Sequence, residues 1–334
     1  MAESVHVGEI AEKLSDELFR EFFWQKEGPT NQDWPCEKSE EHGHATHPAD
    51  VVFWYDEPYS QTRTYIHCDL KSFGKSSVKS TAVKKATLSL VKQIECAEIS
   101  EEWQTKYTHG NVNINIVGLL FVYNHDTQYD GNFTKLMRGA SADGISVTPG
   151  SRLFIFGPDD ILWLDTVRSN IRLMRGDDGT HSLPTQDRCR YYYPQLTMRK
   201  NIRPDIAKAA TLEMLTSPWI ILEYDFPTPE YTKGYVLFYK RTATSIQEFI
   251  YVIDYLRHYQ LLDSSIYVQI QVTSANTAAS HLFSKAISAY ISDTLGIDAD
   301  EPLAKIIKRI KLKTMTQVVT QYSSVVLGME YDRT

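Results

Sequence analysis

Two carboxylates and an amine lie close together in the first quarter of the chain. Asp50 precedes an apolar segment, and Asp69 and Lys71 follow late in a second segment, 19 residues further on. In a strand, alternate residues share a face, so Asp69 and Lys71 point the same way as Tyr65 and His67. Asp50 joins them if the two segments pair as neighbouring strands. Such a group can hold a hard divalent cation and activate a water, and hydrolysis of a phosphodiester needs both.

The spacing of apolar residues predicts the elements that position this group in the first half of the chain. A polar loop is expected before the first strand, and a loop of roughly 25 residues, long enough to be functional, after residue 123. The expected elements are a helix over 7–26, strands over 51–55 and 63–73, a helix over 80–99, strands over 112–123 and 153–156, and a helix from 157 to about 176. The apolar run 112–123 predicts a strand that is buried on both faces.

The second half again mixes strands and helices, after a polar, irregular stretch over 175–199. The expected elements are strands over 219–226, 235–240 and 266–272, helices over 245–261 and 277–295, a basic helix over 305–313 and a strand within 318–330. Because the length of the chain is large for one core, we predict an α/β protein with two domains. The bounds that we predict are a first domain over 1–176, a linker over 177–204 and a second α/β domain over 205–334.

Composition and charge narrow the class of protein. The net charge of −7 argues against a surface that is basic throughout, although contact with nucleic acid requires only a local basic patch. No apolar run is long enough to span a membrane, and the first residues lack the pattern of a secretory signal. The cysteines are far apart in the sequence, without a Cys-x-x-Cys pair: Cys36, Cys68, Cys96 and Cys189. We therefore expect a cytoplasmic protein with reduced thiols and no zinc finger.

A local basic patch follows the second strand. Between Lys71 and Lys92 every charged residue is a lysine, in an otherwise acidic chain. The candidate contacts to nucleic-acid phosphates are Lys75, Lys79, Lys84 and Lys85. The solvated face of a helix would give the same pattern.

The motifs around the two carboxylates resemble those of the PD-(D/E)xK nuclease superfamily. Pro48-Ala49-Asp50-Val51 is similar to the first acidic motif of that family, and Asp69-Leu70-Lys71 to the second. The order of elements, with a leading helix, two strands, a lysine-rich helix and a buried strand, extends the resemblance over residues 7–124 and on to 176. The resemblance implies a restriction-endonuclease-like mixed central sheet flanked by helices. The second half resembles no family that we can name.

The resemblance also implies a role for each matched residue. Asp50 and Asp69 would bind Mg²⁺ or Mn²⁺, and the backbone carbonyl of Leu70 would add a further oxygen ligand. Lys71 would hold or deprotonate the attacking water, or offset the negative charge that grows on the phosphorane. A glutamate of the first helix often completes such sites, and Glu17 is the first candidate.

Glu21 is the second candidate for that glutamate, and Gln93, on the helix after the lysine, could also reach the site. Simpler interpretations exist for each residue alone. Asp50 could cap a strand or a turn, and Asp69 and Lys71 could form a surface ion pair of little energetic value.

Two further clusters have alternative interpretations. His42, His44 and His47 could bind zinc or another transition metal, but a polar loop without a nearby cysteine is more typical of a surface segment. The run of tyrosines over 191–193 could stack on bases, although packing at the domain boundary is the simpler interpretation.

Together these features predict a magnesium-dependent endodeoxyribonuclease in which a metal-activated water attacks DNA, in a prokaryotic anti-phage setting. The second domain would serve recognition, dimerisation or binding of a partner protein, and a homodimer or larger complex would supply two sites for a double-strand cut. Two alternatives stay open on the sequence. One is a non-catalytic scaffold subunit that keeps the nuclease fold, and the other is an RNase or tRNA-cleaving toxin.

Overall fold

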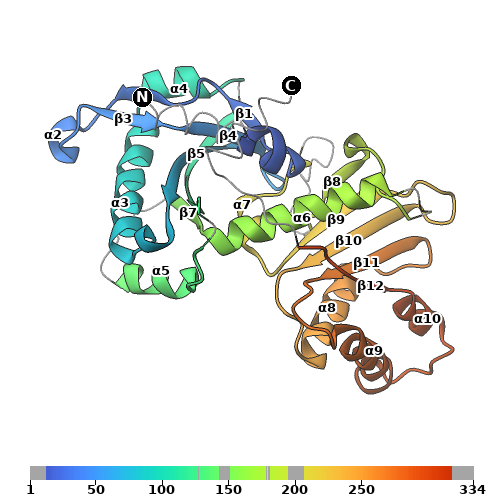
Figure 1. The fold of residues 1–334 in the computed structure, drawn as a ribbon. Helices are drawn as coiled ribbons and strands as arrows, with labels where there is room; N and C mark the ends of the chain where they lie inside the picture. The colour runs from blue at the N-terminus through green and yellow to red at the C-terminus, as the bar shows by residue number, and fades with distance from the viewer. Residues whose placement is uncertain are drawn as a thin grey trace. The chain divides into compact units, whose positions relative to one another are not determined.

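The structure is a computed structural model (Figure 1). The residues that it describes are 13–110, 112–126, 128–142, 151–177, 179, 181–194 and 207–317. The chain forms two compact units, and the change from the first to the second falls between Leu162 and Trp163. Each unit contains its own five-stranded sheet.

The sheet of the first unit is mixed, as the resemblance implies. Its strands, in spatial order, are β1 (Gln25–Glu27), β4 (Val51–Asp56), β5 (Thr62–Phe73), β6 (Asn113–Asn124) and β7 (Arg152–Phe156). The pairs β1–β4 and β4–β5 are antiparallel, whereas β5–β6 and β6–β7 are parallel. The long strand β5, which carries the Asp-Leu-Lys motif, therefore lies at the centre of the sheet.

Helix α3 (Ser80–Ala97) makes the crossover that the parallel pair β5–β6 requires. It packs closely on β6 at Gly118, where an added Cβ would lie only 3.1 Å from Ile94 Cγ1 and 2.7 Å from Leu153 Cδ1. The same core contains buried side chains of β5 and of the following helix α4 (Glu101–Tyr107), among them Tyr65 and Trp103. The apolar stripe of α3 is thus buried against the face of the sheet that also carries the candidate site.

Several elements of the first unit differ from the prediction. The helical segment described before the first strands is short, with a π-helical turn η1 (Leu14–Phe19), and β1 occupies residues that were predicted as helix. Residues 7–12 of the predicted helix lie outside the described residues. The predicted polar loop instead contains β2 (Gln32–Pro35), helix α2 (Ser39–His42) and β3 (Thr46–Ala49), with β2 and β3 paired antiparallel.

The predicted loop after residue 123 contains helix α5 (Phe133–Ala142), so the prediction of an irregular segment there was wrong. Helix α4 was also not predicted. By contrast, the strands at 51–55, 63–73, 112–123 and 153–156 and the two long helices were predicted to within a few residues, the last of these helices being α6 (Pro158–Gly176).

The sheet of the second unit has the order β12-β11-β10-β9-β8. Its strands are β8 (Cys189–Tyr191), β9 (Trp219–Asp225), β10 (Lys233–Tyr239), β11 (Ile266–Val272) and β12 (Lys311–Thr314). β8, β9 and β10 pair antiparallel, and β10, β11 and β12 pair parallel. The other elements are η3 (Gln186–Arg188), α7 (Leu212–Thr216), α8 (Ile246–His258), α9 (Ala279–Ala289), the π-helical turn η4 (Tyr290–Leu295) and α10 (Pro302–Lys308).

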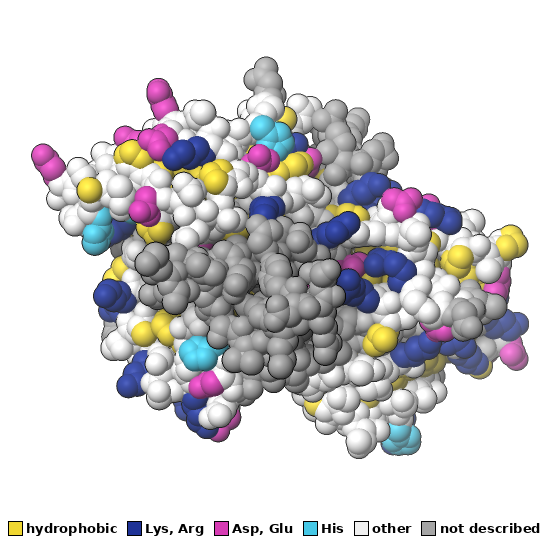
Figure 2. Space-filling model, turned by 45° about the horizontal axis from the view of Figure 1, so that its top comes forward, with side chains coloured by type: hydrophobic (Ala, Val, Ile, Leu, Met, Phe, Trp, Pro, Cys, Tyr) yellow, Lys and Arg dark blue, Asp and Glu magenta, His cyan; other side chains and the backbone are white. Residues whose placement is uncertain are grey.

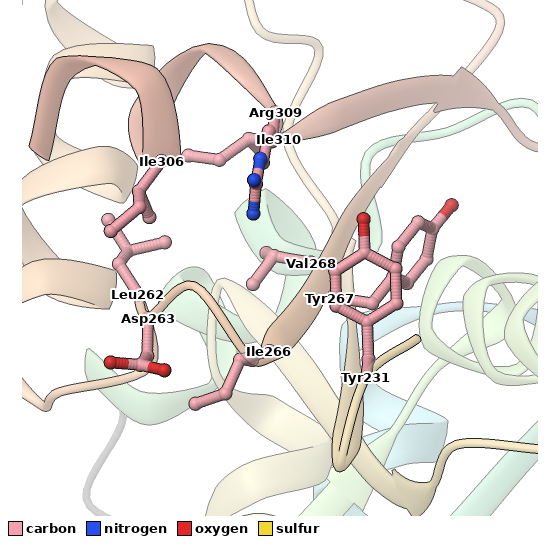
Figure 3. A pocket seen from close by; sticks show the side chains of 9 residues that line it. All are labelled: Tyr231, Leu262, Asp263, Ile266, Tyr267, Val268, Ile306, Arg309 and Ile310. Carbon is pink, nitrogen blue, oxygen red and sulfur yellow. The ribbon is translucent and has the colours of Figure 1, made fainter. Parts of the chain in front are cut away.

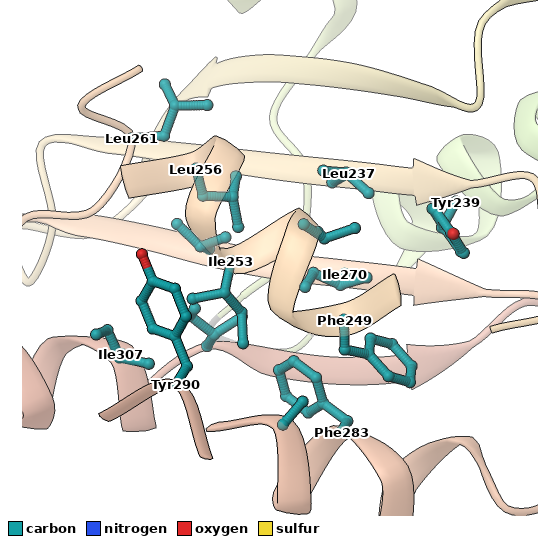
Figure 4. Close-up of a cluster of buried hydrophobic side chains, with 14 of the residues drawn as sticks. Leu237, Tyr239, Phe249, Ile253, Leu256, Leu261, Ile270, Phe283, Tyr290 and Ile307 are labelled. Atoms are coloured by element: carbon teal, nitrogen blue, oxygen red, sulfur yellow. The ribbon is translucent and has the colours of Figure 1, made fainter. Parts of the chain in front are cut away.

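The core of the second unit lies between its sheet and helices α8 and α9 (Figure 4). Leu237 and Ile270, from neighbouring strands, meet Ile253 of α8 and Phe283 of α9, and all four are buried. The predicted basic helix over 305–313 was wrong in its second part, because the chain leaves α10 at Lys308 and continues as β12, parallel to β11. The strand predicted within 318–330 lies outside the described residues.

The predicted fold class is confirmed: the chain is an α/β protein with a mixed five-stranded sheet flanked by helices in its first half and a second sheet-containing region after it. The domain bounds 1–176, 177–204 and 205–334 stay a prediction. Among the described residues, no helix is both long and apolar enough to cross a membrane.

Candidate active site

The antiparallel pairing of β4 with β5 brings the two predicted carboxylates together. Val51 is paired with Cys68, so Asp50, one residue before β4, lies opposite Asp69. The backbone N–H of Leu70 donates to Asp50 Oδ2 at 2.7 Å, which fixes the carboxyl group of Asp50 beside β5. The side chains of Asp50 and Asp69 are also within hydrogen-bonding reach of each other. Both residues are buried.

The two carboxylate oxygens of Asp69 have different surroundings. Its Oδ1 accepts a hydrogen bond from Lys71 Nζ, the residue two positions along the same strand face. Its Oδ2 is buried and, within the described residues, accepts no hydrogen bond from a protein donor. A buried carboxylate oxygen without a donor is costly unless a proton or a cation meets it.

The electrostatics of Asp50 reflect the same crowding. Burial, followed by the charge of Asp69, raises the pKa of Asp50 to about 7, although the Leu70 N–H and Lys71 act in the opposite direction. Two adjacent buried carboxyl groups therefore disfavour a second negative charge in the metal-free protein. A divalent cation between them would remove that penalty.

A hydrogen-bonded chain behind the carboxylates holds β5 against α3. His67, two residues before Asp69, is fully buried; its Nε2 lies 2.9 Å from Gln93 Oε1, and its Nδ1 accepts from Trp103 Nε1 at 3.2 Å. These partners assign the proton of the ring to Nε2, and burial lowers the pKa of His67, so the ring is neutral. Gln93, predicted as an additional site residue, lies between His67 and Ser89 and positions the strand that carries Asp69. His67 lies two residues before Asp69, on the same face of the strand, and this spacing is the sequence signal that indicates its place beside the site.

The two glutamates predicted to complete the site lie in and just after η1. Glu17 is half-buried within the turn, and Glu21 follows it and is buried. Which of the two completes the site stays a prediction.

The predicted phosphate-contacting lysines occupy one stretch after β5, in different surroundings. Lys75 lies in η2 (Lys75–Ser77) and forms an exposed ion pair of 3.0 Å with Asp130. Lys79 and Lys85 are exposed at the start of α3, and Lys84 is half-buried between them. The face of the molecule in Figure 2 carries both basic and acidic side chains, so it is not basic throughout.

The histidine cluster divides in the structure. His42 ends α2 and His47 lies in β3, and both are buried, whereas His44 is exposed. His42 and His47 approach Cys36 and Cys96 rather than His44. The prediction that no cysteine lies near these histidines was wrong, because Cys96 reaches the cluster from α3, far away in the sequence.

Two other features lie in the second unit. The three tyrosines of the 191–193 run pack within the second unit: Tyr191 is buried in β8, Tyr192 packs on the core, and Tyr193 Oη donates to the carbonyl of Ala209. The second unit also contains a small hollow (Figure 3), whose cavity volume of about 10 Å³ is close to that of one water molecule and far below the size of a ligand pocket. Its lining includes Tyr231, Tyr267, Asp263 and Arg309.

Comparison with known proteins agrees with the geometry of the first unit. Residues 1–160 match the family model described as "GAPS4 protein PD-(D/E)XK nuclease domain". No curated protein and no solved structure matches the chain. The resemblance drawn from the two acidic motifs is thus confirmed for the N-terminal half, in which residues 1–160 match a PD-(D/E)XK nuclease domain family. Nucleases of this class generally use divalent metals, and a nuclease domain implies contact with nucleic acid.

Proposed function

We propose that the chain is a metal-dependent endodeoxyribonuclease whose active site is formed by Asp50, Asp69 and Lys71. The observation that carries this proposal is the contact of two buried carboxyl groups on paired strands, with an amine at one of them and an unmet oxygen on Asp69. The match of residues 1–160 to a nuclease domain family supports the assignment.

The residues fit a hard divalent cation such as Mg²⁺ or Mn²⁺. Carboxylate oxygens are the preferred ligands of these ions. Asp69 Oδ2 accepts no hydrogen bond within the described residues and the pKa of Asp50 is raised, so a cation bound here would stabilise both carboxylates. Asp50 and Asp69 would hold the cation, the Leu70 carbonyl would be a further oxygen ligand, and Glu17 or Glu21 would complete the set. When bound, the cation would supply charge stabilisation at the phosphoryl group and a water of lowered pKa.

The side chains of the chain itself would do the remaining work. Lys71 is held by Asp69 and is about one-third exposed, so its amine can reach a substrate phosphate while keeping that partner. In this position it can orient the attacking water, or donate to the phosphoryl oxygens as negative charge builds up on them. The hydrogen bond between Gln93 and His67 would hold β5 against α3 and so support the positions of Asp69 and Lys71.

DNA is the substrate that we propose, with Lys79, Lys84 and Lys85 as contacts to its phosphates. Lys75 can join them if its ion pair with Asp130 opens. A double-strand cut requires two sites, so we propose that the chain acts as a homodimer or with a partner protein, with the second unit serving recognition or assembly. A nuclease domain joined to a second α/β unit suits a role in prokaryotic anti-phage defence.

Incubation of the purified full chain with supercoiled plasmid tests the proposal. With Mg²⁺ or Mn²⁺ we expect nicking or linearisation, and no cleavage with excess chelator. Asp69→Ala and Lys71→Ala should abolish it, whereas Asp33→Ala, which removes an exposed carboxylate of the same unit, should not. Equal cleavage by the wild type and both site variants would show that these residues do not form the site.

Comparison of substrates tests the choice of DNA. Duplex DNA, single-stranded RNA and tRNA are offered to the same preparation under the same metal conditions. Cleavage of RNA or tRNA with intact duplex DNA would retain the site and replace the substrate. No cleavage of any substrate, with candidate partner proteins present, would favour a non-catalytic scaffold.

A further inference from the structure

A second cluster of metal-binding side chains lies in the first unit, apart from the carboxylate pair. It consists of Cys36, His42, His47 and Cys96, all buried, with relative exposures of 8%, 5%, 3% and 0%. One potential ligand atom of each residue lies within 4.8 Å of all the others. The segment from β2 to β3 provides three of them, and the last turn of α3 provides Cys96.

Four of the six separations among the ligand atoms match the edges of a tetrahedron around one ion, and all six are within 4.8 Å. Cys36 Sγ and Cys96 Sγ are 3.7 Å apart, and His42 Nδ1 and His47 Nε2 are 3.4 Å apart. His42 Nδ1 lies 3.4 Å from Cys36 Sγ and 3.5 Å from Cys96 Sγ. A tetrahedral zinc ion with ordinary bond lengths gives edges of about 3.8 Å between two sulfurs, about 3.3 Å between two nitrogens and about 3.5 Å between sulfur and nitrogen.

We propose that Cys36, His42, His47 and Cys96 bind a zinc ion in a closed, structural Cys₂His₂ site. Two thiolates and two neutral imidazoles match the ligand preference of Zn²⁺, and two thiolate charges balance that of the ion. With four protein ligands and a buried setting, the site has no open position for a substrate. It is therefore distinct in chemistry from the oxygen-ligand site at Asp50 and Asp69.

The surroundings of the cluster are those of a metal site rather than of a plain core. His42 uses Nδ1 toward the cluster, and its Nε2 lies 3.3 Å from Glu95 Oε2, a carboxylate that orients the ring and raises its basicity. The backbone N–H groups of Glu37 and Lys38 hydrogen-bond to the sulfur of Cys96. Gly43, with φ of +71°, makes the left-handed turn after α2 that lets His42 and His47 face the same point.

The proposed ion would stabilise the two elements that flank the carboxylate pair. His47 lies in β3, three residues before Asp50, and Cys96 lies in α3, one turn after Gln93, which holds His67. A link between β3 and α3 therefore fixes the start of β4 and the helix behind β5 at once. Loss of the ion should loosen the segment from β3 to Asp50 before it affects the second unit.

Elemental analysis of the full chain, purified without added metal and dialysed against metal-free buffer, tests the proposal. We expect a single zinc ion per chain. Cys96→Ser and His47→Asn should reduce zinc to background, whereas Cys68→Ser, a buried cysteine of β5, and His44→Asn, an exposed neighbour in the same segment, should retain it. Asp69→Asn should also retain it, which separates this site from the proposed catalytic one.

A measurement on the wild type covers the case in which the ligand variants fail to fold. Replacement of the ion by Co²⁺ should give intense thiolate-to-cobalt absorption and tetrahedral ligand-field bands. Modification of the thiols with a mercurial should release zinc stoichiometrically to a metal-sensitive dye. Failure of the plasmid assay with zinc retained would remove the proposed function and leave this site intact.

Three results would overturn the proposal. The first is full-length folded protein without zinc or another thiol-binding metal. The second is a disulfide between Cys36 and Cys96 found by mass spectrometry in the native protein. The third is zinc that is lost in Asp69→Asn but kept in Cys96→Ser.

Discussion

Replacement of Asp50 by asparagine should stabilise the metal-free protein at neutral and alkaline pH while removing the proposed activity. In the wild type, the folded state must hold the carboxylate of Asp50 in a buried place next to Asp69, and these two causes raise its pKa to about 7. In the wild type the Leu70 N–H donates to Asp50 Oδ2 at 2.7 Å. Asparagine keeps an oxygen that can accept this hydrogen bond, but its side chain carries no charge. The substitution therefore removes a cost of folding together with a proposed metal ligand.

The size of the effect follows from the shift of the pKa. A rise from 3.8 to about 7 corresponds to about 4 kcal/mol between the ionised and protonated forms. We expect about 2–4 kcal/mol of added stability in Asp50→Asn at about pH 8, since the amide is also a buried polar group and keeps part of the cost.

The dependence on pH has a definite sign. Below the unfolded-state pKa of 3.8, Asp50 is protonated in both states and the wild type carries no penalty. As the pH rises, the unfolded state releases this proton first, so the wild type loses stability until the pH passes about 7. The difference between Asp50→Asn and the wild type should thus be small near pH 4 and largest at about pH 8.

Denaturant unfolding with chelator present, repeated across this pH range, measures the difference. Asp33→Asn, at an exposed position of β2, is the matched control and should show no such pH-dependent gain. Addition of Mg²⁺ should raise the stability of the wild type and leave Asp50→Asn unchanged. A variant that is less stable than the wild type at about pH 8, or a difference that does not vary with pH, would refute this account of the carboxylate pair.

Three further predictions concern the surface, the support of the site and the second unit. Lys84→Glu with Lys85→Glu should weaken DNA binding and reduce the salt slope of log K by up to about 2, and an unchanged slope in a titration at several salt concentrations would exclude these lysines as phosphate contacts. Gln93→Leu leaves the buried Nε2–H of His67 without its acceptor and should cost about 1–3 kcal/mol in denaturant unfolding, and no loss would show that this hydrogen bond does not support β5. Leu237→Ala, in the core of the second unit, should cost about 2–5 kcal/mol in the unfolding of that unit while the folded chain still cuts plasmid, and a loss of cutting without a loss of folded protein would tie the second unit to catalysis.

The strands that carry the site were predictable because their patterns are local. Alternation from Arg63 to Phe73 places Asp69 and Lys71 on one face, and the structure has this segment as β5 with Lys71 Nζ bound to Asp69. The apolar run at 112–123 predicted a strand that is buried on both faces, and β6 is buried along most of its length. The alternation of residues and a short motif are enough to predict a site whose geometry depends on one strand and its neighbour.

What the sequence did not predict depends on long-range contacts. The polar segment with His42 and His47 contains few apolar residues, and it contacts Cys96 on α3, which is 60 residues from Cys36 in the sequence. Helix α5 lies in a segment rich in glycine and polar residues, so its pattern did not stand out from a loop. The choice between Glu17 and Glu21 depends on how η1 meets the sheet, and the π-helical turn there breaks the helical spacing that the prediction assumed.

Calorimetric titration of the full chain with Mn²⁺ is the most direct test of the carboxylate site. Mn²⁺ prefers oxygen ligands, so the cysteine and histidine cluster does not compete for it. We expect saturable binding by the wild type and by Lys71→Ala, and no binding by Asp50→Asn or Asp69→Asn. Equal binding by the wild type and both carboxylate variants would contradict the central claim that Asp50 and Asp69 together hold the catalytic cation.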